Sequence, residues 1–258
     1  MQARTLPTAR GWAWIVDGFA LWRRNPALIT FLVFGMSLSL LLVAAVPFIG
    51  RVAMSLVAPA LSLGVFNGCK AVAERRKVGP DILFSGFRQN LPEQIKIGGL
   101  YLIGTVITMG LTTLIDPDVY DTLSRLILSE EPSAETLDAD ADFFVALAFG
   151  ALTQTPLMMA YWFAPILAGW GKVPAVKAMF FSVVACWRNW RPFLAYSIGL
   201  MGVAVVAMTL ISVIGLLSPL LAVVPAMAFP IVFVPVVFAS TYTNAVDVLE
   251  RIGPDDIA

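Results

Sequence analysis

Six long runs of apolar residues, separated by short polar connections, dominate the hydrophobic pattern of the chain. The runs occupy residues 27–46, 52–69, 97–115, 143–168, 193–216 and 219–243. A helix needs about 20 apolar residues to cross the roughly 30 Å hydrocarbon core of a bilayer. None of the runs alternates apolar and polar positions as a barrel strand does. The pattern predicts an all-α polytopic membrane protein with six transmembrane helices.

The composition indicates that lipid is the main solvent of the chain. Hydrophobic residues make up 59% of the sequence and charged residues only 13%, whereas soluble proteins carry about 25% charged residues. So few charges cannot cover a water-exposed surface. The two cysteines, Cys69 and Cys186, are too few and too far apart in sequence to indicate a disulfide framework or a zinc site.

The distribution of charge predicts the orientation of the spans. Fifteen of the 17 basic residues fall before the first span, in the 70–96 and 170–192 connections, or after the last span. The other connections hold two, Arg51 and Arg125. Because basic residues are retained in the cytoplasm, we expect both termini to be cytoplasmic. The connection 116–142, with nine of the 17 acidic residues, is then an acidic periplasmic loop of a bacterial inner-membrane protein.

Three stretches share an order of features that predicts an internal repeat. Each has an aromatic residue followed by Arg, an Asn one or two residues later, and a Pro four or five residues after the aromatic. Each then runs into a membrane span. The stretches read LWRRNP, GFRQNLP and CWRNWRP, with the pairs Trp22–Arg23, Phe87–Arg88 and Trp187–Arg188.

The second span of each unit carries a proline that we expect to kink its helix, and these are Pro59, Pro165 and Pro235. The sequence predicts one membrane domain, 1–258, built of three parallel two-helix repeats. Their bounds are 8–70, 79–170 including the acidic connection, and 173–245, followed by a short cytoplasmic tail, 246–258.

Amphipathic segments precede the first span of each unit. Apolar residues recur at helical spacing in 12–22 and 174–190, with charged residues on other faces. Such segments are typical of helices that lie in the headgroup plane, so each repeat is expected to begin with a cytoplasmic interfacial helix. The alternative is that they pack on the cytoplasmic face of the bundle.

The aromatic and basic residues of the three bends are candidate contacts for lipid headgroups or for a partner. The third bend adds a second Trp and a second Arg, which suggests that it is the most specialised copy. The alternative is that these residues only anchor the chain where it enters the membrane. The candidates are Trp22, Arg23, Phe87, Arg88, Trp187, Arg188, Trp190 and Arg191.

The chain lacks the residue patterns of common catalytic and metal sites. It contains no histidine, the most frequent general base and zinc ligand. The segment LDADADF at 137–143 has alternating Asp residues, but Phe143 and Phe149 stand where a calcium loop needs Gly and Glu. We therefore expect no catalytic residues, no cofactor, no metal and no nucleic-acid partner, and read this segment as part of an acidic, disordered outer loop.

Gln154 is the most polar residue that the pattern places deep in a span. It could form an interhelical hydrogen bond beside Pro156, or it could line a polar path. A cavity lined by Gln154, by the threonines of the third span and by the three kink prolines would favour transport. A solid, interdigitated axis would argue against it.

The segments GWAWIVDGFALWRRNP, APALSLG, YWFAPILAGW and VKAMFFSVVACWRN resemble a proteobacterial family of hypothetical multi-pass inner-membrane proteins without a described activity. The resemblance covers most of the chain and is weakest in the acidic loop and the last two spans. It implies a bacterial inner-membrane location and no catalytic residues. The six-helix layout is also similar to the membrane domain of some glycerophosphodiester phosphodiesterases.

Two functions remain open from the sequence. The chain could be a non-catalytic scaffold or accessory subunit that binds membrane lipids, a partner protein or a second copy of itself. It could instead be a transporter or flippase-like protein for a lipid or another apolar or neutral molecule.

Overall fold

The structure, a computed structural model, describes residues 4–128 and 141–249. Every regular element in these ranges is helical, as predicted, and one of them, η1, is a 3₁₀ helix. The elements are α1 Arg10–Arg24, α2 Pro26–Ala44, α3 Gly50–Ala73, η1 Pro80–Arg88, α4 Leu91–Thr113, α5 Val119–Leu128, α6 Ala141–Trp162, α7 Ala164–Gly169, α8 Ala175–Arg188, α9 Trp190–Leu217 and α10 Pro219–Val248.

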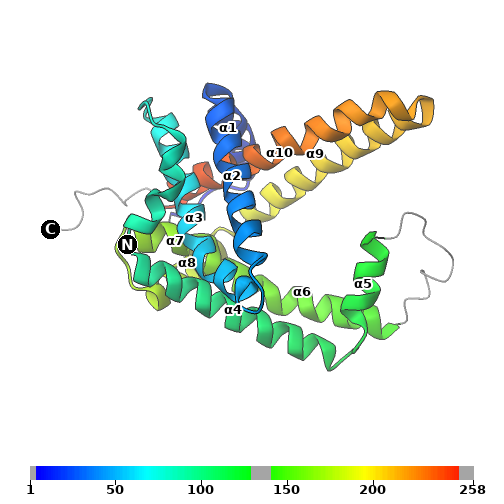
Figure 1. The fold of residues 1–258 in the computed structure, drawn as a ribbon, viewed down its shortest axis with the longest axis horizontal. Coiled ribbons are helices and arrows are strands. Elements are labelled where there is room, and N and C mark those ends of the chain that lie inside the picture. The colour runs from blue at the N-terminus through cyan, green and yellow to red at the C-terminus, as the bar shows by residue number, and fades with distance from the viewer. Residues whose placement is uncertain (1–3, 129–140, 250–258) are drawn as a thin grey trace.

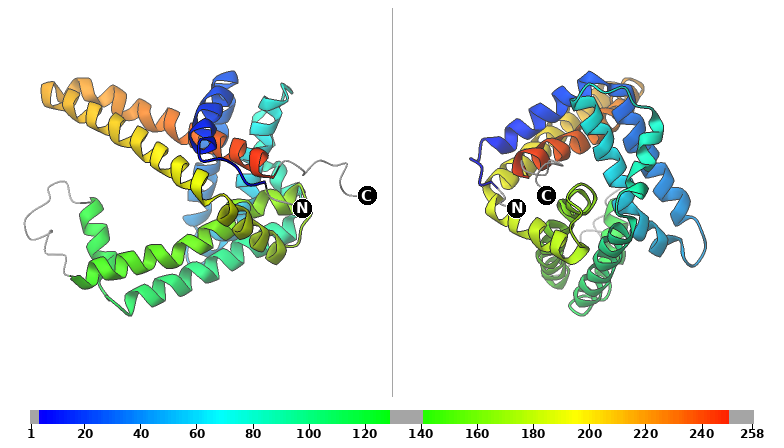
Figure 2. Two further views of the ribbon diagram at one scale, coloured as in Figure 1. Left: turned by 180° about the vertical axis from the view of Figure 1, so that it is seen from behind. Right: turned by 90° about the vertical axis from the view of Figure 1, so that its left-hand side faces the viewer.

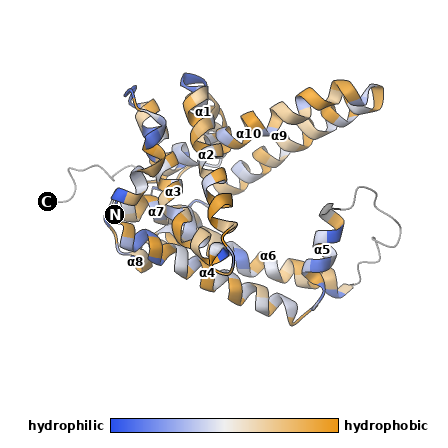
Figure 3. Ribbon diagram, viewed as in Figure 1, coloured by the Kyte–Doolittle hydropathy of each residue, from blue (hydrophilic) through white to orange (hydrophobic). Residues whose placement is uncertain are grey.

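The prediction of six apolar helices of membrane-spanning length is confirmed. Within the described residues they are Pro26–Ala44, Gly50–Ala73, Leu91–Thr113, Ala141–Gly169, Trp190–Leu217 and Pro219–Val248. The fourth comprises α6 and α7. Colouring by hydropathy shows α2, α9 and α10 as almost continuously apolar, whereas polar residues gather at the bend between α1 and α2 and in the connection between α3 and η1 (Figure 3).

The six long helices form three hairpins that diverge from a shared base. The α9–α10 and α4–α6 hairpins extend away from this base in different directions, and the α2–α3 hairpin lies steeply across them (Figures 1 and 2). The base, called the hub below, consists of α1, η1, α7 and α8 with the adjoining ends of the long helices. Most of the buried apolar side chains belong to one cluster in this hub.

Small residues let the helices of the hub approach one another closely. A Cβ atom on Gly18 of α1 would lie 2.5 Å from the Cβ atom of Ser240 of α10. One on Gly64 of α3 would collide with the backbone of Leu83 in η1. Close helix approach through small residues is the usual packing mode of membrane helices. The hub is therefore an interdigitated, solid contact.

A local cap begins the first long helix, and a side chain from another helix interrupts the fourth. Pro26 occupies the first turn of α2, and the Asn25 side chain accepts a hydrogen bond from the Leu28 N–H at 3.2 Å. The fourth span is interrupted at Phe163. Its N–H donates to Ser182 Oγ at 2.9 Å, and the Ser182 hydroxyl donates to the Met159 carbonyl. In a continuous helix that N–H and that carbonyl would bond to each other, so Ser182 of α8 breaks the helix by insertion.

The reading of the acidic connection as an irregular loop was wrong for residues 119–128, which form α5. Apolar residues recur here at helical spacing, and Val119 is buried in a small cluster with Phe143 and Ala146 of α6. The high content of acidic residues masked this period. Of the calcium-like segment, Asp138 and Asp140 lie outside the described residues, as does the tail from residue 250.

Candidate site between the first and last helices

Three faces of α1 perform different tasks. Trp14, Gly18 and Leu21 are buried in the hub. A second face, exposed, carries the apolar residues Trp12, Val16 and Phe19. The third face is polar and carries three charged side chains at intervals of seven residues, namely Arg10, Asp17 and Arg24. Residues seven apart lie on one line along a helix because seven residues make almost two turns.

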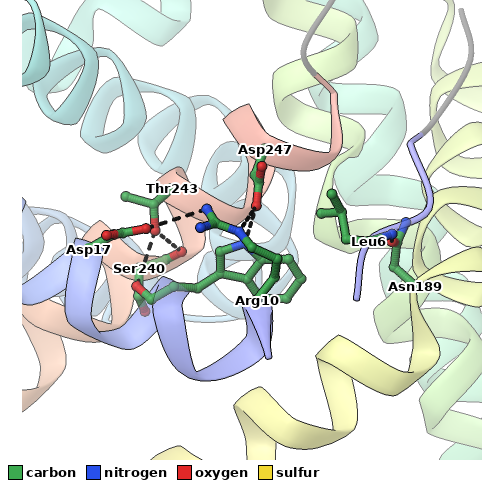
Figure 4. Close-up of polar contacts among 8 residues, drawn as sticks. Leu6, Arg10, Asp17, Asn189, Ser240, Thr243 and Asp247 are labelled. Atoms are coloured by element: carbon green, nitrogen blue, oxygen red, sulfur yellow. Dashed lines mark hydrogen bonds and ion pairs between the residues drawn. The ribbon is translucent and has the colours of Figure 1, made fainter. Parts of the chain in front are cut away.

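Asp247, near the end of α10, joins that helix to α1. One of its carboxylate oxygens accepts from Arg10 Nε at 2.7 Å and from the indole N–H of Trp14 at 2.8 Å (Figure 4). The Thr243 hydroxyl, one turn earlier, donates to the Trp14 carbonyl at 3.2 Å. The first helix is thus held to the last by a charge-assisted contact at one end and by close backbone packing at Gly18.

An open pocket of about 390 Å³ lies beside this contact. It is lined by the polar face of α1, by the end of α10 and by Ala73 of α3. Its charged and polar lining residues are Arg10, Asp17, Arg24, Tyr242, Thr243 and Asp247. The pocket therefore presents two guanidinium groups and two carboxylates, an arrangement suited to binding a polar ligand with separated charges.

A probable inner membrane protein of Burkholderia thailandensis is 34% identical to this chain over 206 residues, which cover 77% of the chain and 74% of that protein. The chain belongs to this family of inner membrane proteins. No family model and no solved structure matches the chain. The relative supports the resemblance derived from the sequence and, with the six apolar helices, makes this a multi-pass membrane protein.

The structure of this inner membrane protein keeps the aromatic and basic residues of the three bends apart. Arg23, Arg88 and Arg188 are exposed, whereas Trp22 and Phe87 are half-buried against the hub. Within the described residues, no hydrogen bond, ion pair or ring contact links one bend to another. The three predicted pairs are thus separate surface features and do not form a common site.

The third bend is the most exposed of the three. Trp187 is 71% exposed and Trp190 is 54% exposed. The Arg191 guanidinium lies over the Trp190 ring, 5.4 Å from its centroid. The added Trp and Arg are therefore available for contact with headgroups or a partner. That role remains a prediction.

The asparagine of each bend has a structural partner that sequence reasoning missed. Asn90 donates to the Ala168 carbonyl at 3.0 Å. Asn189 is fully buried and its side-chain oxygen accepts from the Leu6 N–H at 2.9 Å (Figure 4). Its amide donates to the Arg4 carbonyl at 2.8 Å. The recurrence of Asn in all three bends, with Asn25 as the cap of α2, was the signal for such a role.

The three predicted kink prolines occupy different settings. Pro165 begins α7 directly after the interruption at Phe163. Pro59 and Pro235 lie inside α3 and α10, which continue through them. All three prolines are buried. They shape the hub and do not line the pockets described for this protein.

Gln154 lines a second pocket, of about 320 Å³, between α4, α5 and α6. Its amide donates to the Tyr101 hydroxyl at 3.1 Å, which is the predicted interhelical hydrogen bond. The pocket also receives Thr105, Thr108 and Thr112 of the third span. The pocket thus brings Gln154 and these threonines together without the three kink prolines, and a polar path along it stays a prediction.

The two cysteines are buried and free. In α8, burial raises the pKa of the Cys186 thiol to about 12, although the hydrogen bond with Ser182 lowers it. The thiol is thus protonated and inert at neutral pH. In the part of the chain that the structure describes, no group of three or more His, Cys, Asp or Glu side chains could hold a metal ion.

Proposed function

We propose that this protein is a non-catalytic scaffold or accessory subunit that binds lipids and a partner protein in the inner membrane. The proposal rests on one contrast. The hub is closely packed, whereas the hairpins that extend from it leave helix faces without a packing partner. Of the 28 residues of α9, only Pro192 and Tyr196 are buried. A Cβ atom added at Gly202 would meet no other part of the protein within 4 Å. Membrane helices gain stability by packing against other helices, so such faces suit association with a partner.

Three parallel repeats fit the contacts between the elements. The leading element of the second and third units packs on the second helix of the unit before it, since η1 lies against α3 and α8 against α6. The leading element of the first unit, α1, packs in the same way on the second helix of the last unit, α10. Two of these contacts use matching positions. Gly18 and Leu83 stand four residues before the bend aromatic, and their partners Ser240 and Gly64 stand five residues after the kink proline. This correspondence supports the repeat bounds 8–70, 79–170 and 173–245.

The proposal includes cytoplasmic termini, a periplasmic 116–142 connection and leading elements at the cytoplasmic headgroup boundary. The excess of basic residues on one set of connections supports this orientation. Replacing Arg23, Arg88 and Arg188 together with Glu is expected to impair insertion or orientation. Accessibility of single cysteines introduced into the connections would measure it, and an unchanged topology would refute this part of the proposal.

Affinity purification in a mild detergent tests the scaffold role directly. Mass spectrometry of the eluate should identify a companion protein at a fixed stoichiometry, because exposed apolar faces suit a partner. The matched variant is Gly202→Phe, which places a large side chain on the exposed face of α9 where nothing lies within 4 Å. The fold should therefore persist, whereas the companion protein should be lost from the eluate. Recovery of the protein alone would count against the proposal.

A lipid or apolar-molecule transporter is a second candidate, and the pocket around Gln154 favours it. This pocket combines an apolar lining with a few polar groups, as small-molecule sites do. Fluorescent-lipid flipping in proteoliposomes tests the idea. Gln154→Leu should slow flipping, and Thr209→Val on the exposed side of α9 is the control. Equal rates in empty and protein-containing vesicles would exclude this function.

A further inference from the structure

The pocket between α1 and α10 contains one strong ion pair and two weakly paired charges. Arg10 and Asp247 neutralise each other at 2.7 Å, and the Asp247 side chain is only 18% exposed. Asp17 reaches Arg10 at 3.4 Å and remains 49% exposed. Arg24 is exposed and donates a long hydrogen bond, 3.4 Å, to the Ala73 carbonyl. The pocket therefore keeps one carboxylate and one guanidinium that a ligand can engage.

The spacing of these two groups limits the ligand. Asp17 and Arg24 are seven residues apart on one face of α1, about 10 Å along its axis. Long side chains can shorten this gap, since Arg10 and Asp17 have the same spacing and their charged atoms meet at 3.4 Å. Asp17 and Arg24 can therefore hold a compact zwitterion between them, and a phosphate joined to an ammonium group through two carbons is one.

The remaining surface of α1 indicates where the ligand comes from. Beside the polar face runs the exposed apolar face of Trp12, Val16 and Phe19, which are 54%, 51% and 42% exposed. Aromatic residues and arginines flanking an apolar face are typical of helices at the headgroup boundary. Acyl chains of a bound lipid can lie on this face while its headgroup enters the pocket.

We propose that this pocket binds a phosphoethanolamine-type zwitterion, a phospholipid headgroup, with its phosphate on Arg24 and its primary ammonium on Asp17. The inference rests on the proposed placement of α1 at the membrane boundary. A guanidinium fork matches phosphate oxygens, and a primary ammonium can donate hydrogen bonds to a carboxylate. A choline headgroup has no N–H to donate to Asp17. A glycerol headgroup leaves the lipid anionic and offers Asp17 no cationic group.

Lipid retention by the full chain in detergent tests the proposal. The protein is incubated with equal amounts of phosphatidylethanolamine, phosphatidylcholine and phosphatidylglycerol of matched acyl chains, then separated from free lipid. Mass spectrometry should find phosphatidylethanolamine enriched over the other two. Asp17→Asn and Arg24→Gln should each lower this preference by about fivefold to tenfold, the effect of losing one charge-assisted hydrogen bond.

Lys177→Gln is the control, since Lys177 is an exposed basic residue of α8 that does not line the pocket. It should leave the preference unchanged. The melting temperature of each variant in detergent, which should match that of the wild type because both altered side chains are exposed, verifies folding.

A second experiment adds soluble phosphoethanolamine to lipid-free protein and measures the melting temperature. Stabilisation of the wild type, absent in both pocket variants and without any lipid preference, would assign the site to a free compound of the same chemistry. Equal retention of the three lipids together with no stabilisation would overturn the inference. Neither outcome depends on a companion protein, so the proposed scaffold role stands or falls separately.

Discussion

Replacing Asp247 with alanine removes the acceptor that joins the last helix to the first. The indole N–H of Trp14, a fully buried residue, then loses its acceptor, which costs about 1–3 kcal/mol. Arg10 loses its ion pair as well. Because the Arg10 side chain is 38% exposed, water replaces most of that interaction, and the loss adds roughly 0.2–1 kcal/mol. The substitution should destabilise the protein by about 1–4 kcal/mol.

Asp247→Asn separates the two contributions. Its amide oxygen still accepts a hydrogen bond from the Trp14 indole, so only the ion pair is lost and the cost should stay below about 1 kcal/mol. Thermal unfolding of both variants in one detergent is the measurement, with about 2–4 °C expected for each kcal/mol in a chain of this size. Equal shifts for the two variants, or no shift for Asp247→Ala, would refute the argument that Trp14 depends on this carboxylate.

Two further substitutions and one labelling experiment probe the hub. Gly18→Val places a side chain where even a Cβ atom meets Ser240 at 2.5 Å, so the melting temperature should fall by the equivalent of about 1–3 kcal/mol; an unchanged value would mean that α1 does not pack on α10. Asn189→Leu leaves main-chain groups of the N-terminal segment unpaired, and protease cleavage in that segment should become faster than in the wild type. Cys186 should resist maleimide at pH 8 in the native protein because burial raises its thiol pKa to about 12, and reaction should follow only after unfolding; rapid labelling of the native protein at that position would contradict the burial.

The six long helices were predictable because the signal for each is local. A run of about 20 apolar residues must find lipid or a protein interior wherever it lies, and the bend prolines mark where a helix begins. The same reasoning failed for α5, a ten-residue helix in a connection that holds nine of the 17 acidic residues, although α5 itself contains only one, Asp121. Its Val119 is buried against Phe143 of α6, a contact that the sequence alone does not indicate.

The pocket at α1 and α10 was beyond sequence reasoning for a physical reason. Asp247 and Trp14 are 233 residues apart, and nothing near either residue indicates the other. In the sequence Asp247 is simply a charge in the tail. Ser182 is likewise an ordinary polar residue of α8, and its insertion at Phe163 depends on how two helices cross. By contrast, Gln154 was predicted to bond between helices or to line a polar path, and the first of these is present as its hydrogen bond to Tyr101.

The contact between the first and last helices cannot form until α10 has been synthesised. At about 5–20 residues per second, a ribosome makes α10 roughly 12–47 s after α1, because 233 residues separate Trp14 from Asp247. Until α10 is made, Trp14 can contact Phe193 and Tyr196 of α9, but its indole N–H lacks the acceptor Asp247 and Gly18 lacks its contact with Ser240. A nascent chain truncated before α10 would leave this side of α1 uncovered permanently.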